Sequence, residues 1–357
     1  MLISFIIYLN SFKFNEYDPI LLTEILIIRP QSIQLGDTIC SLPMFKALKN
    51  KFPDSYITFI GCPTNYNVNL KKLNPYINEF TIFRKDNIKV VYYFFKNLRK
   101  KKYDLIIVPT TIRISSTSYM IAMLAKGKKK IGFTRIDEKR NRLGFVLDIK
   151  LETDWVRDKT NQVFRFLDSV KCLGCDISID EIKKMRMDIS KDDIAFGNAY
   201  AEVNFPDKSR LVFGFHPGGG NPAYIWDFNN YFELIKKSYE RYNPYILITS
   251  GFLDKDITDK LESKLKEANI PYIYNKDMDA YGLAAVLKHV NVYATNNTGV
   301  MHLAAFTGTN TVSVFRKGDT AEWQPLYNNS KCVESKTDSI NSVTVEEVFE
   351  KITGFKF

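Results

Sequence analysis

The chain of 357 residues is long enough for two domains, and its 45% hydrophobic and 25% charged residues are typical of a globular protein. No apolar run reaches the roughly 18 residues of a membrane span, which argues against a transmembrane helix. The net charge of +10 favours an anionic partner, such as a phosphorylated ligand, an acidic membrane surface or a nucleic acid, although solvated lysine-rich faces explain it equally well.

The apolar opening at residues 1–10 has no basic segment before it and no small-residue cleavage site. We interpret it as an extension or an extra strand rather than a signal peptide. The cysteines are odd in number and scattered, which favours a reducing compartment. Cys172 and Cys175 form a single C-x-x-C without a second pair, so we expect buried or helix-end thiols and no metal site.

The first half of the chain alternates short apolar runs with helical patterns, which is typical of a mostly parallel α/β sheet. Strands are predicted at residues 24–29, 56–61, 103–109 and 130–133. Helices are predicted at residues 37–52, 91–101, 115–126 and 159–174. The basic run Lys126–Lys130 is interpreted as a helix end followed by a strand start, because cations favour a helix C-terminus.

Residues 176–192 are polar and irregular, and the domain boundary is predicted there, between residues 185 and 186. The pattern then restarts, with strands at 210–217, 244–251, 271–275, 291–295 and 310–315 and helices at 229–242, 257–268, 280–290, 299–308 and 344–353. Two consecutive units predict two facing Rossmann-like domains, residues 1–185 and 186–357, with the last helix also able to pack back on the first domain. Ligands of such sheets bind at the carboxyl ends of the strands.

Three motifs follow predicted strands. In the first, IIRPQSIQLGDTICSLP at residues 27–43, Arg29 ends a strand and Gly36 and Asp37 open a helix. Asp37 is a good helix N-cap, and it is also a candidate general base that takes the proton of an attacking hydroxyl. Gly36 would let the backbone approach a ligand closely. The motif alone leaves both interpretations open.

In the second motif, FGFHPGGGNPAYIW at residues 213–226, a strand runs into His216 and then into Gly218, Gly219 and Gly220. Successive backbone N–H groups of such a loop can cradle a phosphate, although a flexible turn is the simpler alternative. The spacing matches neither the dinucleotide fingerprint nor the P-loop.

In the third motif, YATNNTGVMHLAAFTGT at residues 293–309, Asn297, Thr298 and Gly299 stand where a helix begins. Their N–H groups and the helix dipole favour an anion, or they form an ordinary cap. His302 lies one turn further on and points either to the same site or into the core. Two anion-binding turns at one sheet edge would suit a diphosphate. The D-x-D triplets at residues 254–256 and 277–279 are interpreted as helix N-terminal turns rather than metal ligands.

Taken together, the three motifs resemble those of glycosyltransferase family 9, the lipopolysaccharide heptosyltransferases and their relatives. The matching segments are RPQSIQLGDTICSLPMFKAL, HPGGGNPAYIW and NTGVMHLAAFTGTNTVSVF, in order between about residues 24 and 327. The resemblance implies a GT-B fold and an inverting transfer, without metal or cofactor, of a sugar from a nucleotide diphosphate donor, with heptose by default, to a cell-envelope glycan or lipid-linked acceptor. It implies Asp37 as the base and Arg29 and Gly36 on the acceptor side. On the donor side it implies His216, Gly218, Gly219, Gly220, Asn297, Thr298, Gly299 and His302.

The chain departs from the family pattern at three places. The loop before Gly36 is longer than usual, and Tyr224 stands where a basic residue usually precedes Trp226, so Arg316 or Lys317 would have to supply that charge. Asn297 replaces the usual aspartate. These departures favour an alternative, a non-catalytic nucleotide-sugar or glycan binder on the same fold. We expect a cytoplasmic protein with peripheral contact to an anionic membrane surface, and no nucleic-acid partner because no binding motif is present.

Overall fold

The computed structural model describes residues 22–30, 34–62, 70–252 and 254–357. The apolar segment at residues 1–10 and part of the loop before Gly36 lie outside these described residues. The chain divides into two compact units. One contains residues 22–30, 40–62 and 70–177, and the other contains residues 34–39 and 178–357. This division lies on the N-terminal side of the boundary predicted between residues 185 and 186.

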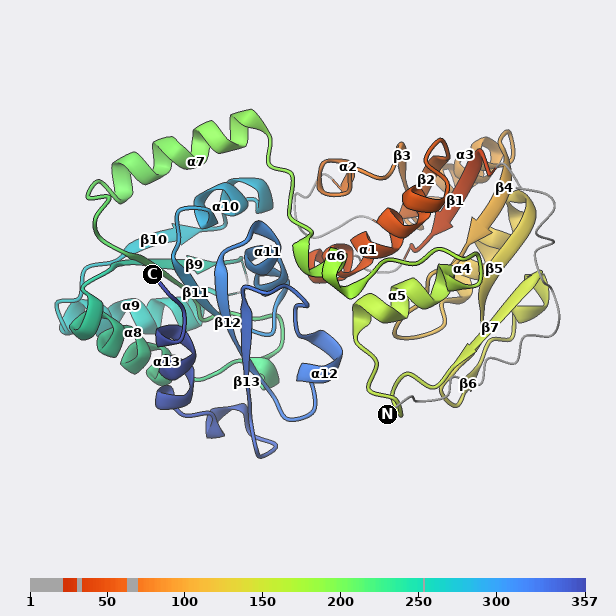
Figure 1. Ribbon diagram of the computed structural model, residues 1–357. Helices are drawn as coiled ribbons and strands as arrows, with labels where there is room; N and C mark the ends of the chain where they lie inside the picture. The colour runs from red at the N-terminus through yellow and green to blue at the C-terminus, as the bar shows by residue number, and fades with distance from the viewer. Residues whose placement is uncertain (1–21, 31–33, 63–69, 253) are drawn as a thin grey trace. The chain divides into compact units, whose positions relative to one another are not determined.

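The first unit is built on a sheet with the strand order β3-β2-β1-β4-β5-β6, in which β7 also pairs with β5. Every pair is parallel except β5 with β6. The strands are β1 (Glu24–Ile28), β2 (Tyr56–Gly61), β3 (Glu79–Ile82), β4 (Lys102–Ile107), β5 (Lys126–Ile136), β6 (Lys139–Arg140) and β7 (Ile149–Thr153). The helices in this part of the chain are α1 (Leu35–Lys51), α2 (Leu70–Leu73), α3 (Ile88–Leu98), α4 (Ser116–Leu124) and α5 (Gln162–Lys171) (Figure 1).

The second unit has a fully parallel sheet with the strand order β10-β9-β8-β11-β12-β13. Its strands are β8 (Val212–His216), β9 (Tyr245–Ser250), β10 (Ile273–Lys276), β11 (Val292–Asn296), β12 (Asn310–Phe315) and β13 (Ser330–Glu334). Its helices are α6 (Ile179–Lys184), α7 (Lys191–Asn204), α8 (Phe228–Tyr242), α9 (Lys255–Glu267), α10 (Ala280–Leu287), α11 (Gly299–Thr307), α12 (Thr320–Trp323) and α13 (Val345–Thr353). Both sheets have the mostly parallel, Rossmann-like order that the sequence predicted.

Apolar periodicity explains why these segments pack. In β1, residues Ile25–Ile28 are all buried, as expected of a strand covered on both faces. In α8 the buried residues recur at helical spacing, at Tyr231, Leu234, Ile235 and Ser238, so one stripe of the helix faces the sheet. Helix α13 adds its own apolar face to the core of the second unit.

The basic run Lys126–Lys130 was predicted as a helix end followed by a strand start, and only the strand start is confirmed, because α4 ends at Leu124 and β5 begins at Lys126. It forms the start of β5, where Lys126 pairs with Lys102 and Lys129 pairs with Leu105 in a parallel register. Lys128 forms an ion pair with Asp104 at 2.7 Å. Backbone pairing with β4 therefore outweighs the weak strand propensity of lysine and glycine, and the side chains of Lys126, Lys128 and Lys129 remain exposed.

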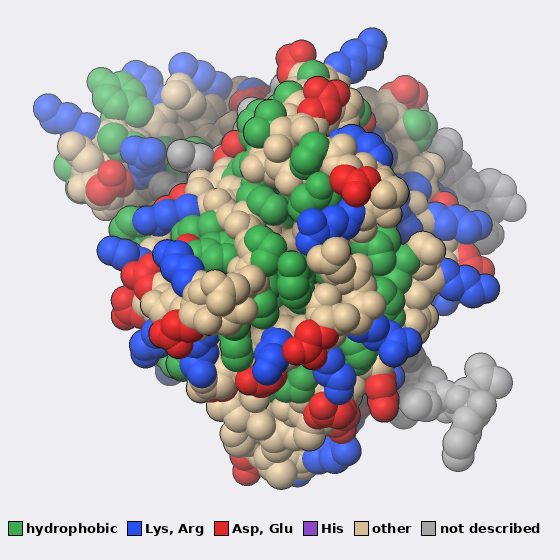
Figure 2. All heavy atoms as spheres, turned by 90° about the vertical axis from the view of Figure 1, so that its left-hand side faces the viewer, with side chains coloured by type: hydrophobic (Ala, Val, Ile, Leu, Met, Phe, Trp, Pro, Cys, Tyr) green, Lys and Arg blue, Asp and Glu red, His purple; other side chains and the backbone are tan. Residues whose placement is uncertain are grey.

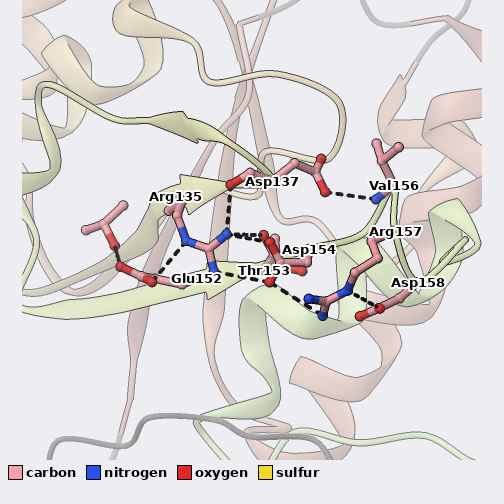
Figure 3. A network of polar contacts seen from close by, with 9 residues as sticks. Arg135, Asp137, Glu152, Thr153, Asp154, Val156, Arg157 and Asp158 are labelled. Atoms are coloured by element: carbon pink, nitrogen blue, oxygen red, sulfur yellow. Dashed lines mark hydrogen bonds and ion pairs between the residues drawn. The ribbon is translucent and has the colours of Figure 1, made fainter.

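The far end of the first sheet is held by an arginine. Arg135, in β5, forms a bidentate ion pair with Asp154, just beyond β7, and its Nε donates to Glu152 at 3.1 Å. Figure 3 shows the guanidinium of Arg135 between these two carboxylates and the carbonyl oxygen of Asp137, to which it donates at 2.7 Å. This network joins β5 and β7 near their carboxyl ends, and it belongs to the fold rather than to any motif of the sequence.

Candidate functional site

The carboxyl edge of the second sheet brings the two predicted donor motifs together. Strands β8 and β11 are parallel neighbours, with His216 opposite Thr295, so the loop after β8 and the turn after β11 leave the sheet side by side. A Cβ atom built on Gly219 would lie 3.7 Å from Cγ2 of Thr298. The prediction that both turns share one sheet edge is confirmed.

The glycine loop is anchored by a residue that the sequence analysis did not single out. The Nδ2 atom of Asn296, buried at the end of β11, donates to the carbonyl oxygens of Pro217 and Gly218, each at 2.9 Å. Its Oδ1 atom accepts from the N–H of Trp226 at 3.1 Å. Asn296 therefore fixes both ends of the loop, whereas its neighbour Asn297 is half-buried and can contact a ligand.

A second residue that was not predicted for the site, Asp254, contacts the glycine loop. Its carboxylate is buried and accepts from the N–H groups of Gly219 at 3.0 Å and Gly251 at 2.7 Å. A Cβ on Gly218 would lie 2.0 Å from Cγ of Asp254, so a side chain at position 218 requires the carboxylate to move. Asp254 stands at the N-cap position of α9 and Asp256 in its first turn, as predicted, but the Asp254 side chain makes no capping bond and turns to the glycine loop instead. Asp279, by contrast, caps α10 as predicted.

His216 is part of a buried polar chain that includes Asp254. Its Nδ1 atom lies 3.0 Å from Oγ1 of Thr249, which in turn lies 2.5 Å from the hydroxyl of Tyr293. Its Nε2 atom lies 3.6 Å from Asp254. Burial lowers the pKa of His216, while the Asp254 carboxylate and the bond to Thr249 oppose that shift. His216 thus links the carboxylate of Asp254 to the hydroxyls of Thr249 and Tyr293.

The turn after β11 is a helix start, as predicted. Thr298 is the N-cap of α11, and its Oγ1 atom accepts from the N–H of Met301 at 3.4 Å. The half-buried Asn297 forms no side-chain hydrogen bond with any residue that the structure describes. His302 is buried within α11, and burial lowers its pKa to about 4. An imidazole with this pKa is neutral at physiological pH.

Arg316 follows β12 and reaches the position where the donor loop lacks its basic residue. Its guanidinium lies 4.5 Å from the ring centroid of Tyr224, and its Nη2 atom donates to the Tyr224 hydroxyl at 3.1 Å. Its Nε atom pairs with Asp319 at 3.3 Å. Of the two proposed substitutes, Arg316 is therefore the one that the structure places against Tyr224.

The first motif contains the predicted acceptor-side residue Arg29 and the predicted base Asp37. Arg29 is buried directly after β1, with its guanidinium 4.9 Å from the ring of Phe166 in α5. Helix α1 begins at Leu35, so Asp37 lies in its first turn rather than at the predicted N-cap. The carboxylate of Asp37 is mostly buried and still benefits from the positive end of the helix dipole.

The first unit has a hollow that the sequence did not predict. A cavity of about 430 Å³ is lined by Pro30, Cys62 and the segment 83–86, which follow β1, β2 and β3 respectively. These three strands are neighbours in the sheet, so the cavity lies at their carboxyl ends. Within the described residues, no cluster of three or more His, Cys, Asp or Glu side chains could hold a metal ion.

Comparison with known proteins identifies the family. The model for glycosyltransferase family 9 (heptosyltransferase) matches residues 91–353. The chain belongs to glycosyltransferase family 9. It is therefore a glycosyltransferase, as the resemblance of the three motifs predicted. No curated protein matches its sequence.

Solved structures of family-9 proteins share the fold. The chain is similar to a family 9 glycosyl transferase from Veillonella parvula (14% identity, 93% of this chain and 96% of that chain, TM-score 0.75). It is also similar to ADP-heptose lps heptosyltransferase II of E. coli (18%, 93% and 98%, TM-score 0.73) and to E. coli heptosyltransferase WaaC with ADP (15%, 93% and 99%, TM-score 0.68). These likenesses confirm the predicted GT-B fold class.

Proposed function

We propose that this family-9 chain is an inverting glycosyltransferase that moves a sugar, heptose by default, from a nucleotide diphosphate donor to a glycan or lipid-linked acceptor. The observation that carries the donor assignment is the adjacency of two turns, the Gly218–Gly220 loop and the Asn297–Gly299 turn, at the carboxyl ends of β8 and β11. Similar structures are described as an ADP-heptose enzyme and as a complex with ADP, and we extend that donor class to this chain.

In the proposed reaction Asp37 accepts the proton of an acceptor hydroxyl as that oxygen attacks the anomeric carbon. The new glycosidic bond forms on the face opposite the leaving group, and the bond to the diphosphate breaks with its electron pair, so the anomeric configuration inverts. The N–H groups at the start of α11 and the guanidinium of Arg316 would stabilise the departing diphosphate. We propose that these fixed positive groups make a metal ion or another cofactor unnecessary.

On the acceptor side we assign Arg29, which follows β1, and Gly36, which lies in the first turn of α1. The predicted acceptor is a cell-envelope glycan or a lipid-linked sugar, and the predicted place of action is the cytoplasmic side of a membrane. Among the described residues, no helix combines the length and the apolar character that crossing a bilayer requires. We propose that contact with the membrane is peripheral.

A second candidate function, nucleotide-sugar or glycan binding without transfer, is favoured by two observations. The N–H of Gly219 already has a protein acceptor in Asp254, and Asn297 lacks the negative charge that aspartate carries at this position of the family pattern. Both features change how a donor would be held.

A donor panel separates the two candidates. ADP-, UDP-, GDP- and CMP-linked sugars would be screened by thermal shift, because a ligand that binds the native state raises the melting temperature. The binding donor would then be incubated with acceptor glycans, with and without EDTA, while nucleotide release is followed. Acceptor-dependent release that survives EDTA supports the enzyme. Binding without release supports the binding protein, and EDTA-sensitive release contradicts metal independence.

A further inference from the structure

Helix α3 presents an unusual outer face. Its inner face packs on the core of the first unit through Leu98, Phe94 and Phe95, and the ring of Phe94 lies 4.8 Å from that of Phe83. The outer residues are also large and apolar or aromatic. Ile88 is 85% exposed, Tyr92 is 61% exposed and Tyr93 is 58% exposed. A helix that only faced water would carry polar residues there, so this face is suited to an interface.

The same segment is strongly basic. Residues 84–102 contain eight Lys and Arg and a single acidic residue, Asp86. Within the described residues, the side chains of Lys89, Lys96 and Arg99 form no ion pair. At helical spacing Lys89 and Lys96 lie beside Tyr92 and Tyr93, so charge and apolar surface share one face.

The excess of positive charge is confined to the N-terminal half of the chain. Residues 1–177 contain 29 Lys and Arg against 16 Asp and Glu, and residues 178–357 contain 21 against 24. Figure 2 shows a face of the second unit on which blue and red side chains are interspersed. The net charge of +10 therefore reflects a local basic surface rather than an evenly charged molecule.

We propose that α3 docks on an anionic lipid surface, with Ile88, Tyr92 and Tyr93 at the boundary between headgroups and acyl chains. Lys89 and Lys96 would contact lipid phosphates while their methylene stems cover apolar surface. Tyrosine suits this depth because its ring is apolar and its hydroxyl is polar.

Other occupants fit the same face less well. A second copy of this chain would bring two strongly basic segments together, and their repulsion opposes association. Single-stranded nucleic acid would need flat aromatic platforms. The rings of Tyr92 and Tyr93 instead meet edge to face, with centroids 5.5 Å apart and planes at 72°, and the most exposed residue, Ile88, has no ring. An anionic lipid surface would attract the positive charges of this face and would also bury the aliphatic side chain of Ile88.

The position of α3 in the chain links this surface to the cavity of the first unit. Arg84, Lys85 and Asp86 line the cavity, Asn87 caps α3, and Ile88 is the first helical residue. A docked α3 thus places a cavity with two cationic side chains next to lipid headgroups.

The test uses the full chain and vesicles of phosphatidylcholine, with or without phosphatidylglycerol, in a flotation assay. We expect binding to the anionic vesicles only, and its loss at high salt. Lys89→Glu with Lys96→Glu, and separately Ile88→Ser with Tyr92→Ser, should weaken binding by at least about tenfold. The matched charge control is Lys236→Glu with Lys255→Glu on exposed positions of α8 and α9, and the matched apolar control is Val203→Ser on α7; both should bind as the parent does.

Equal binding to both vesicle types, or unchanged binding of both α3 variants, would overturn the proposal. Binding of an oligonucleotide instead of vesicles would assign the face to nucleic acid and would also overturn it. Thermal melting establishes that each variant is folded, and the shift caused by the donor nucleotide reports on the second unit independently. Vesicle binding without any donor binding or transfer would refute the proposed function and leave the role of α3 standing. Transfer to a soluble acceptor without vesicle binding would do the reverse.

Discussion

Asp254 accepts a hydrogen bond at 3.0 Å from the backbone N–H of Gly219, so a buried carboxylate stands inside the loop that the sequence assigns to a phosphate. A diphosphate at this edge would approach a negative charge. The remaining positive groups, the start of α11 and Arg316, must then hold the anion. Asp254 also fixes the loop, because the same carboxylate binds Gly251 and lies near His216. These bonds hold the loop in place, and we propose that it supports the donor.

Replacing Gly218 by alanine should destabilise the second unit. The new Cβ would lie 2.0 Å from Cγ of Asp254, and the forced movement should cost about 1–3 kcal/mol of unfolding free energy. Gly220→Ala is the matched control, because its Cβ would meet nothing within 4 Å and should change stability by less than about 0.5 kcal/mol. Urea denaturation of both variants measures the difference. Equal stability of the two would refute the clash with Asp254.

Removing the charge of Arg316 should weaken donor binding. We expect Arg316→Gln to raise the Kd of the nucleotide diphosphate by about tenfold, because a charge-assisted contact to phosphate is lost. Lys317→Gln is the control, since it removes the same charge from the next residue. Isothermal titration with ADP measures both. If Lys317→Gln weakened binding more than Arg316→Gln, the assignment of the substitute cation would be wrong.

Restoring the carboxylate at position 297 should affect function more than stability. The side chain of Asn297 forms no hydrogen bond with the described residues and precedes a helix N-terminus, where a negative charge is tolerated. Asn297→Asp should therefore change unfolding free energy by less than about 0.5 kcal/mol. It should change kcat/KM for the best donor sugar by about tenfold, because the side chain that hydrogen-bonds the sugar becomes negatively charged. Identical donor selectivity would show that position 297 does not contact the sugar.

Stability should fall as the solution is acidified through the range in which histidine titrates. Burial lowers the pKa of His302 from 6.5 to about 4, so between these values the unfolded chain binds a proton that the folded chain does not. Stability is then fully present above pH 6.5 and decreases toward pH 4, by up to about 3 kcal/mol from this residue. His302→Gln should reduce the slope of stability against pH in chemical denaturation. An unchanged slope would mean that His302 is accessible and titrates normally.

Strongly periodic segments were predictable from the sequence, and long-range pairings were not. The helix at Gly299 and the strand Asn310–Phe315 begin where the pattern placed them, because capping and burial act locally. The strand was predicted to begin only at residue 130, whereas β5 begins at Lys126, because its pairing with β4 depends on a segment elsewhere in the chain. Helix α7 was not predicted, because polar and apolar residues are mixed along it. In the structure it packs on α10, with Gly197 against Ala285.

The candidate site shows the same division. The two donor turns follow strands, so their common edge could be inferred from the parallel topology alone. Asp254 gave no such signal, because a carboxylate before a helix ordinarily caps that helix. Only the folded chain shows that it turns toward Gly219, 35 positions away. The sequence likewise could not distinguish the role of Asn296 from that of Asn297. The structure shows that Asn296 is buried and bonded to the loop, whereas Asn297 is half-buried.

The central claim is that Asp37 is the base of a glycosyl transfer from a nucleotide diphosphate sugar. The most direct measurement compares acceptor-dependent nucleotide release by the parent chain and by Asp37→Asn, with donor binding followed in parallel by thermal shift. The account predicts that release falls by about 10²–10⁴-fold while the donor-induced shift in melting temperature is unchanged. Release by Asp37→Asn at the rate of the parent chain would contradict it.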